Sequence, residues 1–223
     1  MKYLIEQCIF PIMDGGQCIG QGFVADGFFI TAAHVVNRWP NCFTDINQQR
    51  IFLSKETPIY KGKGDIEHDS KKEDVAIYLF DGLKSFLHLS ARKILKSEDL
   101  RSYCIFPEFD NSTNQYTNEL SVQPVTLENL EEDNYIYGTC SRYKGSSGSP
   151  LVLGTDVVGI MHGGDENGLC AFLKPISFIF PECSPYESKT IRMLAELGTY
   201  REEPLTPEYF NRKAREQIND AFE

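Results

Sequence analysis

The chain has 223 residues, 41% of them hydrophobic, so it is long enough to bury a substantial core. Its formal net charge of −10 has the wrong sign for phosphate binding, so nucleic acid is not an expected partner. No apolar run approaches the ~20 residues of a membrane span, so we expect no membrane association.

The start of the chain and its cysteines indicate the compartment. The first residues lack the long apolar region and the small-residue cleavage site of a secretion signal. Seven cysteines are scattered along the chain without a C-x-x-C pair, at positions 8, 18, 42, 104, 140, 170 and 183. This usage is typical of small core residues in a reducing compartment, so we expect a cytoplasmic protein.

Short runs of β-forming residues recur along the chain, with turn residues between them. Strands are predicted at residues 22–25, 28–31, 51–54, 75–80, 103–106, 120–126, 135–139, 150–153, 157–162 and 169–173. Asp26-Gly27, between the first two, is a strong signal for a hairpin turn. The pattern predicts an all-β protein and is compatible with two packed barrels.

Near the C-terminus the pattern becomes helical. Residues 189–197 predict a short helix, and Thr206-Pro207 supplies an N-cap and a first-turn proline for a second helix that ends near residue 222. We therefore divide the chain into a β domain, residues 1–183, and a C-terminal helical segment, residues 184–223. The second helix either packs on the β domain or docks a regulatory protein partner.

Three segments carry residues suited to nucleophilic catalysis, in the order His, Asp, Ser. They are residues 28–34 (FFITAAH), 73–80 (EDVAIYLF) and 145–150 (GSSGSP). A serine hydroxyl is a poor nucleophile until an imidazole takes its proton, and a carboxylate must fix the imidazole tautomer. Glycines on both sides of Ser147 allow a tight turn, in which the N–H groups of Gly145 and Ser147 can form an oxyanion hole.

Together the three segments resemble those of chymotrypsin-fold (trypsin-like) serine proteases, which have the same chain order. The resemblance covers roughly residues 20–179. It implies His34 as the general base, Asp74 as its orienting carboxylate and Ser147 as the nucleophile. It also implies two packed six-stranded β-barrels with the site in the cleft between them.

Other carboxylates compete with Asp74 for the orienting role. Asp65, Asp69 and Glu73 lie in a hydrophilic stretch, residues 62–73, that is typical of a solvated loop. Asp74 is preferred because a strand that we expect to be buried follows it directly. Among the four histidines, no pair stands at metal-ligand spacing, so neither a metal nor another cofactor is expected.

The residue before the nucleophile bears on activation. In secreted trypsin-like enzymes an aspartate there pairs with a new N-terminal amine after zymogen cleavage, and here that position is Ser146. The chain resembles instead the intracellular or bacterial trypsin-like branch. We therefore expect no zymogen cleavage.

The resemblance also places the substrate pocket. Its base falls at Ser141 and its walls at Gly164 and Gly168, while Arg142 adds positive charge. Residues 159–164 (GIMHGG) resemble a pocket strand in which a histidine recognises Glu or Gln, but His162 stands one position late. Because side chains alternate along a strand, we expect this shift to turn His162 away from the pocket and toward Asp74, unless a bulge restores it.

The expected function is that of a serine endopeptidase that forms an acyl-enzyme with selected protein or peptide substrates, for regulatory limited proteolysis. A protease that needs no zymogen cleavage requires selectivity or a partner to control it. The alternative is a catalytically silent trypsin-like fold that acts as a protein-binding module. Hydrolysis of small esters would use the same site.

Overall fold

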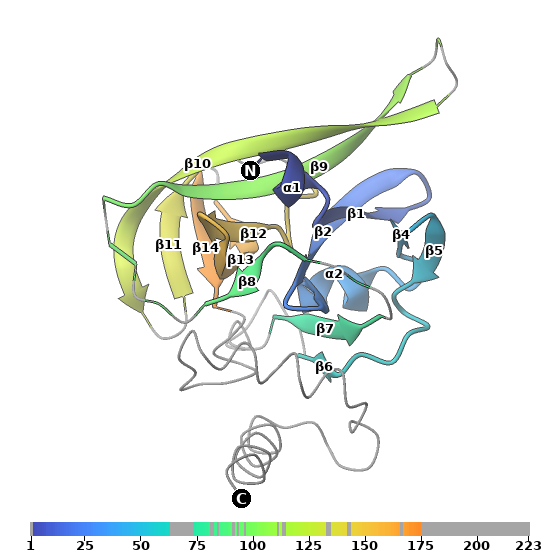
Figure 1. Cartoon of the computed structure of the whole chain (residues 1–223), viewed down its shortest axis with the longest axis horizontal. Helices are drawn as coiled ribbons and strands as arrows, with labels where there is room; N and C mark the ends of the chain where they lie inside the picture. Colours follow the sequence, from blue (N-terminus) through green and yellow to red (C-terminus); the bar gives the residue numbers. More distant parts are fainter. Residues whose placement is uncertain are drawn as a thin grey trace, which may run out of the picture.

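The computed structural model describes residues 2–62, 74–80, 83, 85–90, 92, 94–95, 97–110, 112, 115–132, 135–141, 144–165 and 167–174. In these residues the strands form two seven-stranded sheets, and the helices are short (Figure 1). None of the described helices is long and apolar enough to cross a membrane. The predicted C-terminal helical segment, residues 184–223, lies outside the described residues.

The first sheet is built from the N-terminal part of the chain. Its strands follow the order β5-β4-β1-β2-β3-β7-β6. Its elements, with two helices, are α1 (Lys2–Glu6), β1 (Ile9–Asp14), β2 (Gln17–Ala25), β3 (Phe28–Thr31), α2 (Ala33–Arg38), β4 (Phe43–Ile46), β5 (Gln49–Phe52), β6 (Tyr60–Lys61) and β7 (Ala76–Leu79). Within the described ranges no pairing joins β5 to β6, so this sheet is a half-barrel.

The second sheet closes into a barrel. Its strands are β8 (His88–Leu89), β9 (Leu100–Asp110), β10 (Gln115–Glu132), β11 (Tyr135–Thr139), β12 (Pro150–Leu153), β13 (Asp156–Gly164) and β14 (Leu169–Leu173). The order is β12-β9-β10-β11-β14-β13-β8, and an additional pairing of β12 with β13 closes six strands into a ring. The all-β, chymotrypsin-like prediction is confirmed; the second sheet is the expected six-stranded barrel, whereas the first is a half-barrel.

The predicted strands all coincide with or overlap observed ones. Strands β3, β11, β12 and β14 have the predicted bounds, and β2, β9, β10 and β13 are longer than predicted. The hairpin turn between β2 and β3 is also confirmed, since Asp26 and Gly27 have φ angles of 49° and 84°. Strands β1, β4, β6 and β8 were not predicted, and β1 carries Pro11 in its interior, where proline is disfavoured.

The two sheets pack through one shared core. A cluster of buried side chains contains Phe28 and Ile77 from the first sheet and Tyr103 and Ile160 from the second. Burying each of these large side chains contributes about 1.5–3 kcal/mol to folding. The strand ends that carry the candidate site are therefore held against one another by apolar packing.

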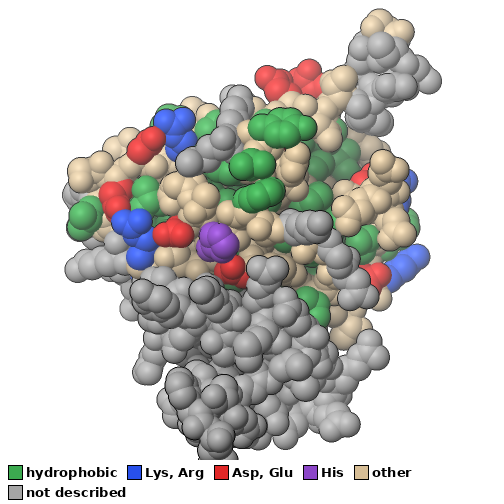
Figure 2. All heavy atoms as spheres, viewed as in Figure 1, with side chains coloured by type: hydrophobic (Ala, Val, Ile, Leu, Met, Phe, Trp, Pro, Cys, Tyr) green, Lys and Arg blue, Asp and Glu red, His purple; other side chains and the backbone are tan. Residues whose placement is uncertain are grey.

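The cysteines and the surface charges agree with the sequence analysis. All six described cysteines are free thiols, and each is buried except Cys18, which is half-buried. Cys183 lies outside the described residues. On the face shown in Figure 2, acidic and basic side chains are interspersed among apolar and neutral ones, without one large basic patch in the described part.

Candidate active site

The pairing of β3 with β7 brings His34 and Asp74 to one edge of the first sheet. These strands are antiparallel, and Thr31 at the end of β3 pairs with Ala76 at the start of β7. The chain leaves β3 and enters β7 at the same edge. His34, in the first turn of α2, therefore lies beside Asp74, which precedes β7.

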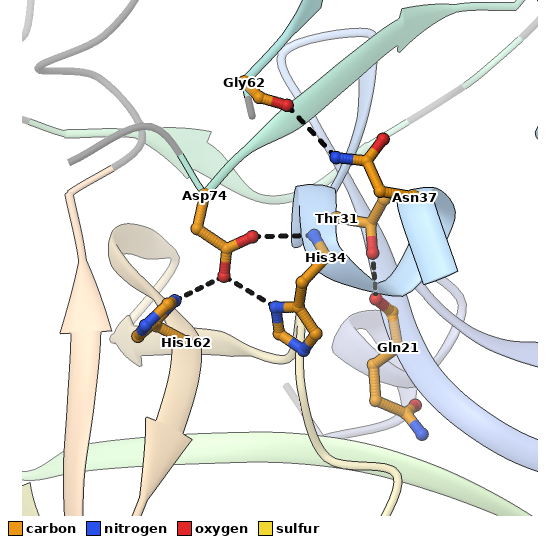
Figure 3. Close-up of polar contacts among 7 residues, drawn as sticks. All are labelled: Gln21, Thr31, His34, Asn37, Gly62, Asp74 and His162. Carbon is orange, nitrogen blue, oxygen red and sulfur yellow. Dashed lines mark hydrogen bonds and ion pairs between the residues drawn. The ribbon is translucent and has the colours of Figure 1, made fainter. Parts of the chain in front are cut away.

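Asp74 holds His34 through both carboxylate oxygens, as Figure 3 shows. Its Oδ1 accepts the main-chain N–H of His34 at 2.7 Å, and its Oδ2 lies 2.7 Å from Nδ1 of the ring. Asp74 is fully buried, and His34 is 6% exposed. An ionised carboxylate requires the proton on Nδ1, so Nε2 of His34 is left as an acceptor.

A second histidine contacts the same carboxylate. Nδ1 of His162, on β13, also lies against Oδ2 of Asp74 (Figure 3). The rings of His34 and His162 meet edge to face, with centroids 5.9 Å apart. The expectation that His162 turns toward Asp74 is confirmed. The expectation that His162 turns away from the pocket is wrong, because the register shifts between Met161 and Gly163 and His162 also lines the pocket described below.

The two histidines keep Asp74 ionised. Burial by itself would raise the pKa of this carboxyl group. Hydrogen bonds from His162 and His34, together with their electrostatic attraction, lower it further than burial raises it, so the pKa lies well below its usual range. Asp74 is therefore an anion at neutral pH that accepts three hydrogen bonds.

The loop of residues 144–149, here called the serine loop, lies between β2 and β13. The carbonyl of Ser147 accepts the N–H of Gln21 at 2.7 Å, and the N–H of Gly148 donates to Met161 at 2.8 Å. Gly148 has a φ of +89°, and a Cβ there would lie 2.1 Å from the carbonyl oxygen of Gln21. Only glycine fits at this position, because of both the positive φ and the close approach.

Both predicted oxyanion-hole donors of the serine loop lack an acceptor among the described residues. Within the described part of the chain, the N–H groups of Gly145 and Ser147 donate no hydrogen bond. The carbonyl of Ser146 instead faces inward, where it accepts from the N–H and the hydroxyl of Ser149. The two predicted oxyanion-hole donors are therefore free to bind a ligand.

His34 and Ser147 line one pocket of about 350 Å³. Ser147 is half-buried, and among the described contacts no hydrogen bond joins its hydroxyl to the His34 ring. Catalytic hydrogen bonds are often formed only when substrate is bound. The relevant observation is therefore that His34 and Ser147 both line the same pocket. Ile19, Val35, Arg38, Trp39, Lys144, Gly145, Ser146, Met161, His162, Gly163 and Gly164 complete the lining.

The residues predicted for substrate binding fall in different places. Gly164 and His162 line the pocket, whereas Ser141 is exposed and is not part of the described lining. Gly168 lies next to Ser141, because its carbonyl accepts the N–H of Cys140 at 3.1 Å. Arg142 lies outside the described residues, as do the three competing carboxylates of residues 62–73.

Arg38 and Trp39 are among the pocket-lining side chains that sequence reasoning missed. Arg38 stands four residues after His34 and Trp39 follows it, so both lie within about one helical turn of the histidine. The signal was this spacing, which places Arg38 on the same face of α2 as His34. Gln21, which contacts the serine loop, carried no sequence signal at all.

The same side chains offer a set of metal-ligand atoms. His34, Asp74 and His162 present ligand atoms within 4.8 Å of one another. However, each Nδ1 needs its proton to bond Asp74, and a zinc ligand nitrogen must be deprotonated. The observed 2.7 Å contact has the length of a charge-assisted hydrogen bond. The geometry therefore fits a carboxylate shared by two imidazoles better than it fits a metal centre.

A second histidine–carboxylate pair has a different setting. Nδ1 of His88 lies 2.9 Å from Oδ1 of Asp26, whose other oxygen accepts the N–H of Leu89 at 2.7 Å. The pair joins the β2–β3 turn to β8. The His88 side chain is 53% exposed, and neither residue lines the pocket of His34.

No protein-family model matches the sequence, and no curated protein sequence is similar to it. Solved structures are similar in fold. The serine protease domain of the Sesbania mosaic virus polyprotein is 20% identical, with a TM-score of 0.54 over 77% of this chain and 89% of that chain. The Rv3671c protease of M. tuberculosis in its active form is 18% identical, with a TM-score of 0.54 over 77% of each chain.

A third similar structure is a mutant of human heparin binding protein. It is 12% identical, with a TM-score of 0.57 over 88% of this chain and 94% of that chain. The three proteins come from a virus, a bacterium and human, so the comparisons do not support assignment to the bacterial branch. They do show that this chain has the fold of chymotrypsin-like serine proteases.

Proposed function

We propose that the chain is a serine endopeptidase with His34 as general base, Asp74 as orienting carboxylate and Ser147 as nucleophile. One observation carries the proposal. Buried Asp74 binds Nδ1 of His34, and His34 lines the same pocket as Ser147. The similar fold of two proteins named as proteases supports it.

The acylation step uses the free atoms of this site. Nε2 of His34 takes the hydroxyl proton of Ser147 as the oxygen attacks the carbonyl carbon of a peptide bond. The negative charge that develops on the carbonyl oxygen is stabilised by the N–H groups of Gly145 and Ser147. His34 then gives its proton to the departing amine, which leaves an ester between the substrate acyl group and Ser147.

Deacylation repeats the same proton transfers with water as the nucleophile. His34 removes a proton from water, which attacks the ester, and the proton then returns to Ser147 as the acid product leaves. Asp74 stabilises the imidazolium in both steps, and its ionised state suits this role. His162 supplies a further hydrogen bond that fixes the position of the Asp74 carboxylate.

Substrate choice is proposed from the pocket residues. Gly164 leaves room in the pocket wall, and the described lining carries the positive side chains Arg38 and Lys144. It carries no carboxylate that faces a Lys or Arg side chain of the substrate apart from buried Asp74, which His34 and His162 already bind. We expect selected protein substrates and regulatory limited proteolysis, with cleavage after Lys or Arg in the minority.

A catalytically silent binding module is the second candidate. A protein with a similar fold is named for heparin binding, so the fold itself does not require protease activity. Heparin is a polyanion, however, and this chain has a formal net charge of −10. The present chain also keeps the serine, histidine and aspartate that hydrolysis needs.

A peptide-library digestion tests the proposal and the selectivity together. The wild-type chain is expected to cleave library peptides with a defined preference, while Ser147→Ala loses roughly 10⁴- to 10⁶-fold in turnover. His88→Ala serves as a matched control, because it removes the histidine of a His–Asp pair outside the pocket. Equal cleavage by wild type and Ser147→Ala would overturn the proposal, and a profile dominated by Lys or Arg would overturn the pocket assignment.

A further inference from the structure

We infer that Gln21 is a positioning residue that holds the two oxyanion-hole residues of the serine loop in place. The inference rests on the proposed function, since it concerns the same Gly145 and Ser147 donors. Gln21 lies on β2 and is fully buried. A buried amide side chain is costly unless its polar atoms are hydrogen-bonded, and here they are.

The side chain of Gln21 pairs with the main chain of Ile105, on β9. Its Oε1 accepts the N–H of Ile105 at 2.9 Å, and its Nε2 donates to the Ile105 carbonyl at 3.0 Å. Nε2 also donates to the carbonyl of Gly145 at 3.1 Å and lies 3.2 Å from the sulfur of Cys18. One side chain of the first sheet therefore bridges the second sheet and the serine loop.

These contacts determine the orientation of the amide. The N–H of Ile105 requires an acceptor, and the carbonyls of Ile105 and Gly145 require a donor. Exchanging the oxygen and nitrogen of Gln21 would place its oxygen against two carbonyl oxygens and leave the N–H without an acceptor. The donor side of the amide must therefore face Gly145.

The main chain of Gln21 holds the other side of the serine loop. Its N–H donates to the carbonyl of Ser147 at 2.7 Å, and its own carbonyl accepts the Thr31 hydroxyl at 2.7 Å (Figure 3). Gln21 thus binds the carbonyls of Gly145 and Ser147 at once. These are the two residues whose N–H groups are the proposed oxyanion-hole donors.

Holding these carbonyls restrains the donors through the backbone of the same two residues. The carbonyl of Gly145 lies in the peptide unit between residues 145 and 146, whereas the N–H of Gly145 lies in the preceding unit. The same holds for the carbonyl and the N–H of Ser147. Fixing both planes limits rotation about ψ at each residue. Gly145 has a φ of +89°, and a Cβ there would lie 2.6 Å from the carbonyl oxygen of Cys18, so this position requires glycine. Because glycine has no side chain to restrict its backbone, the hydrogen bond from Gln21 supplies a restraint.

Gln21→Met tests the inference, because methionine fills a similar volume and cannot form the hydrogen bonds. The matched control is Gln123→Met, which removes a buried glutamine whose Nε2 has no hydrogen-bond partner among the described residues. We expect Gln21→Met to lose roughly 10- to 100-fold in kcat, with KM changed by less than about threefold, a smaller loss than removing an oxyanion donor outright. Gln123→Met should keep the wild-type kcat.

Gln21→Glu provides a rescue variant. A fully buried carboxyl group favours its neutral form, whose oxygen can accept from Ile105 and whose O–H can donate to one carbonyl. Its kcat is expected to lie between those of wild type and Gln21→Met. A folded Gln21→Met with wild-type kcat, or equal losses in the Met and Glu variants, would overturn the inference.

Amide hydrogen exchange separates this inference from the proposed function and needs no activity. The peptide covering residues 144–149 should exchange faster in Gln21→Met than in Gln123→Met. If wild type is inactive and the exchange difference is present, the positioning role stands and the protease proposal fails. If wild type is active and neither kcat nor exchange changes, only the positioning role fails. If Gln21→Met does not fold, the same comparison is made with Gln21→Glu.

Discussion

His162 binds the same oxygen of Asp74 that His34 binds. Both rings use Nδ1, and both meet Oδ2 of the fully buried carboxylate. Because β13 belongs to the second sheet and Asp74 precedes a strand of the first, this contact joins the two sheets at the candidate site. The catalytic carboxylate that we propose is therefore held from both sides.

Removing His162 should weaken both stability and turnover. Hydrogen bonds to charged groups contribute about 1.5–3 kcal/mol, so His162→Ala is expected to lower the free energy of unfolding at pH 7 by about that amount. His34 keeps its own bond to Asp74, so kcat should fall by less than in His34→Ala. Chemical denaturation and steady-state kinetics check both effects. A His162→Ala protein with wild-type stability would contradict this role.

Asp74 should make stability depend on pH in the acid range. Its pKa in the folded protein is lowered, so its contribution is fully present above the unfolded pKa of about 4 and is lost as pH falls below that value. The melting temperature of wild type should fall steeply from about pH 4 downward. Asp74→Asn should be less stable at neutral pH and should lack this part of the decline. Melting curves between pH 2 and pH 7 would contradict the account if both proteins declined in parallel.

Gly148 should tolerate no side chain. In Gly148→Ala the new Cβ would meet the carbonyl of Gln21 at 2.1 Å, so the serine loop must shift and kcat should fall at least about 100-fold. Gly154→Ala is the matched control, since Gly154 also has a positive φ, +66°, but has open space around it. The control should cost about 1–2 kcal/mol of stability and leave kcat unchanged. Equal kinetics in the two variants would exclude the proposed close packing.

The buried thiols should be unreactive in the native protein. Burial raises the pKa of Cys42 and of Cys104 to about 11, so little thiolate is present at pH 8. Iodoacetamide at pH 8, followed by peptide mapping, should find both cysteines unmodified until denaturant is added. Rapid modification of either residue in the folded chain would show that its surroundings are more open than described.

Local patterns were enough to predict most strands, and the resemblance to trypsin-like serine proteases predicted the pairing of His34 with Asp74. Both residues stand beside apolar strand sequences, and β-strand periodicity is visible over a few residues. Strand alternation predicted the turn of His162 toward Asp74, but it did not predict that His162 also lines the pocket, next to a register shift in β13. The strands depend on residues that are close in the sequence, whereas Asp74 stands 40 residues from His34 and 88 residues from His162.

Other features depend on contacts that no short segment encodes. Gln21 lies between two glycines in a strand, and its partners Ile105 and Gly145 are 84 and 124 residues away. The half-barrel of the first sheet depends likewise on long-range pairing. In physical terms, hydrogen bonds of this kind form only after the two sheets pack, so the sequence alone carries no local trace of them.

Covalent labelling of Ser147 tests the central claim most directly. Intact-mass and peptide mass spectrometry after treatment with a fluorophosphonate should find a single adduct on Ser147 in the wild-type chain. Labelling should be absent in Ser147→Ala, strongly slowed in His34→Ala and unchanged in His88→Ala, because His88 bonds Asp26 outside the pocket. A wild-type chain that forms no adduct, or an equal adduct in Ser147→Ala, would contradict the account of this site as that of a serine protease.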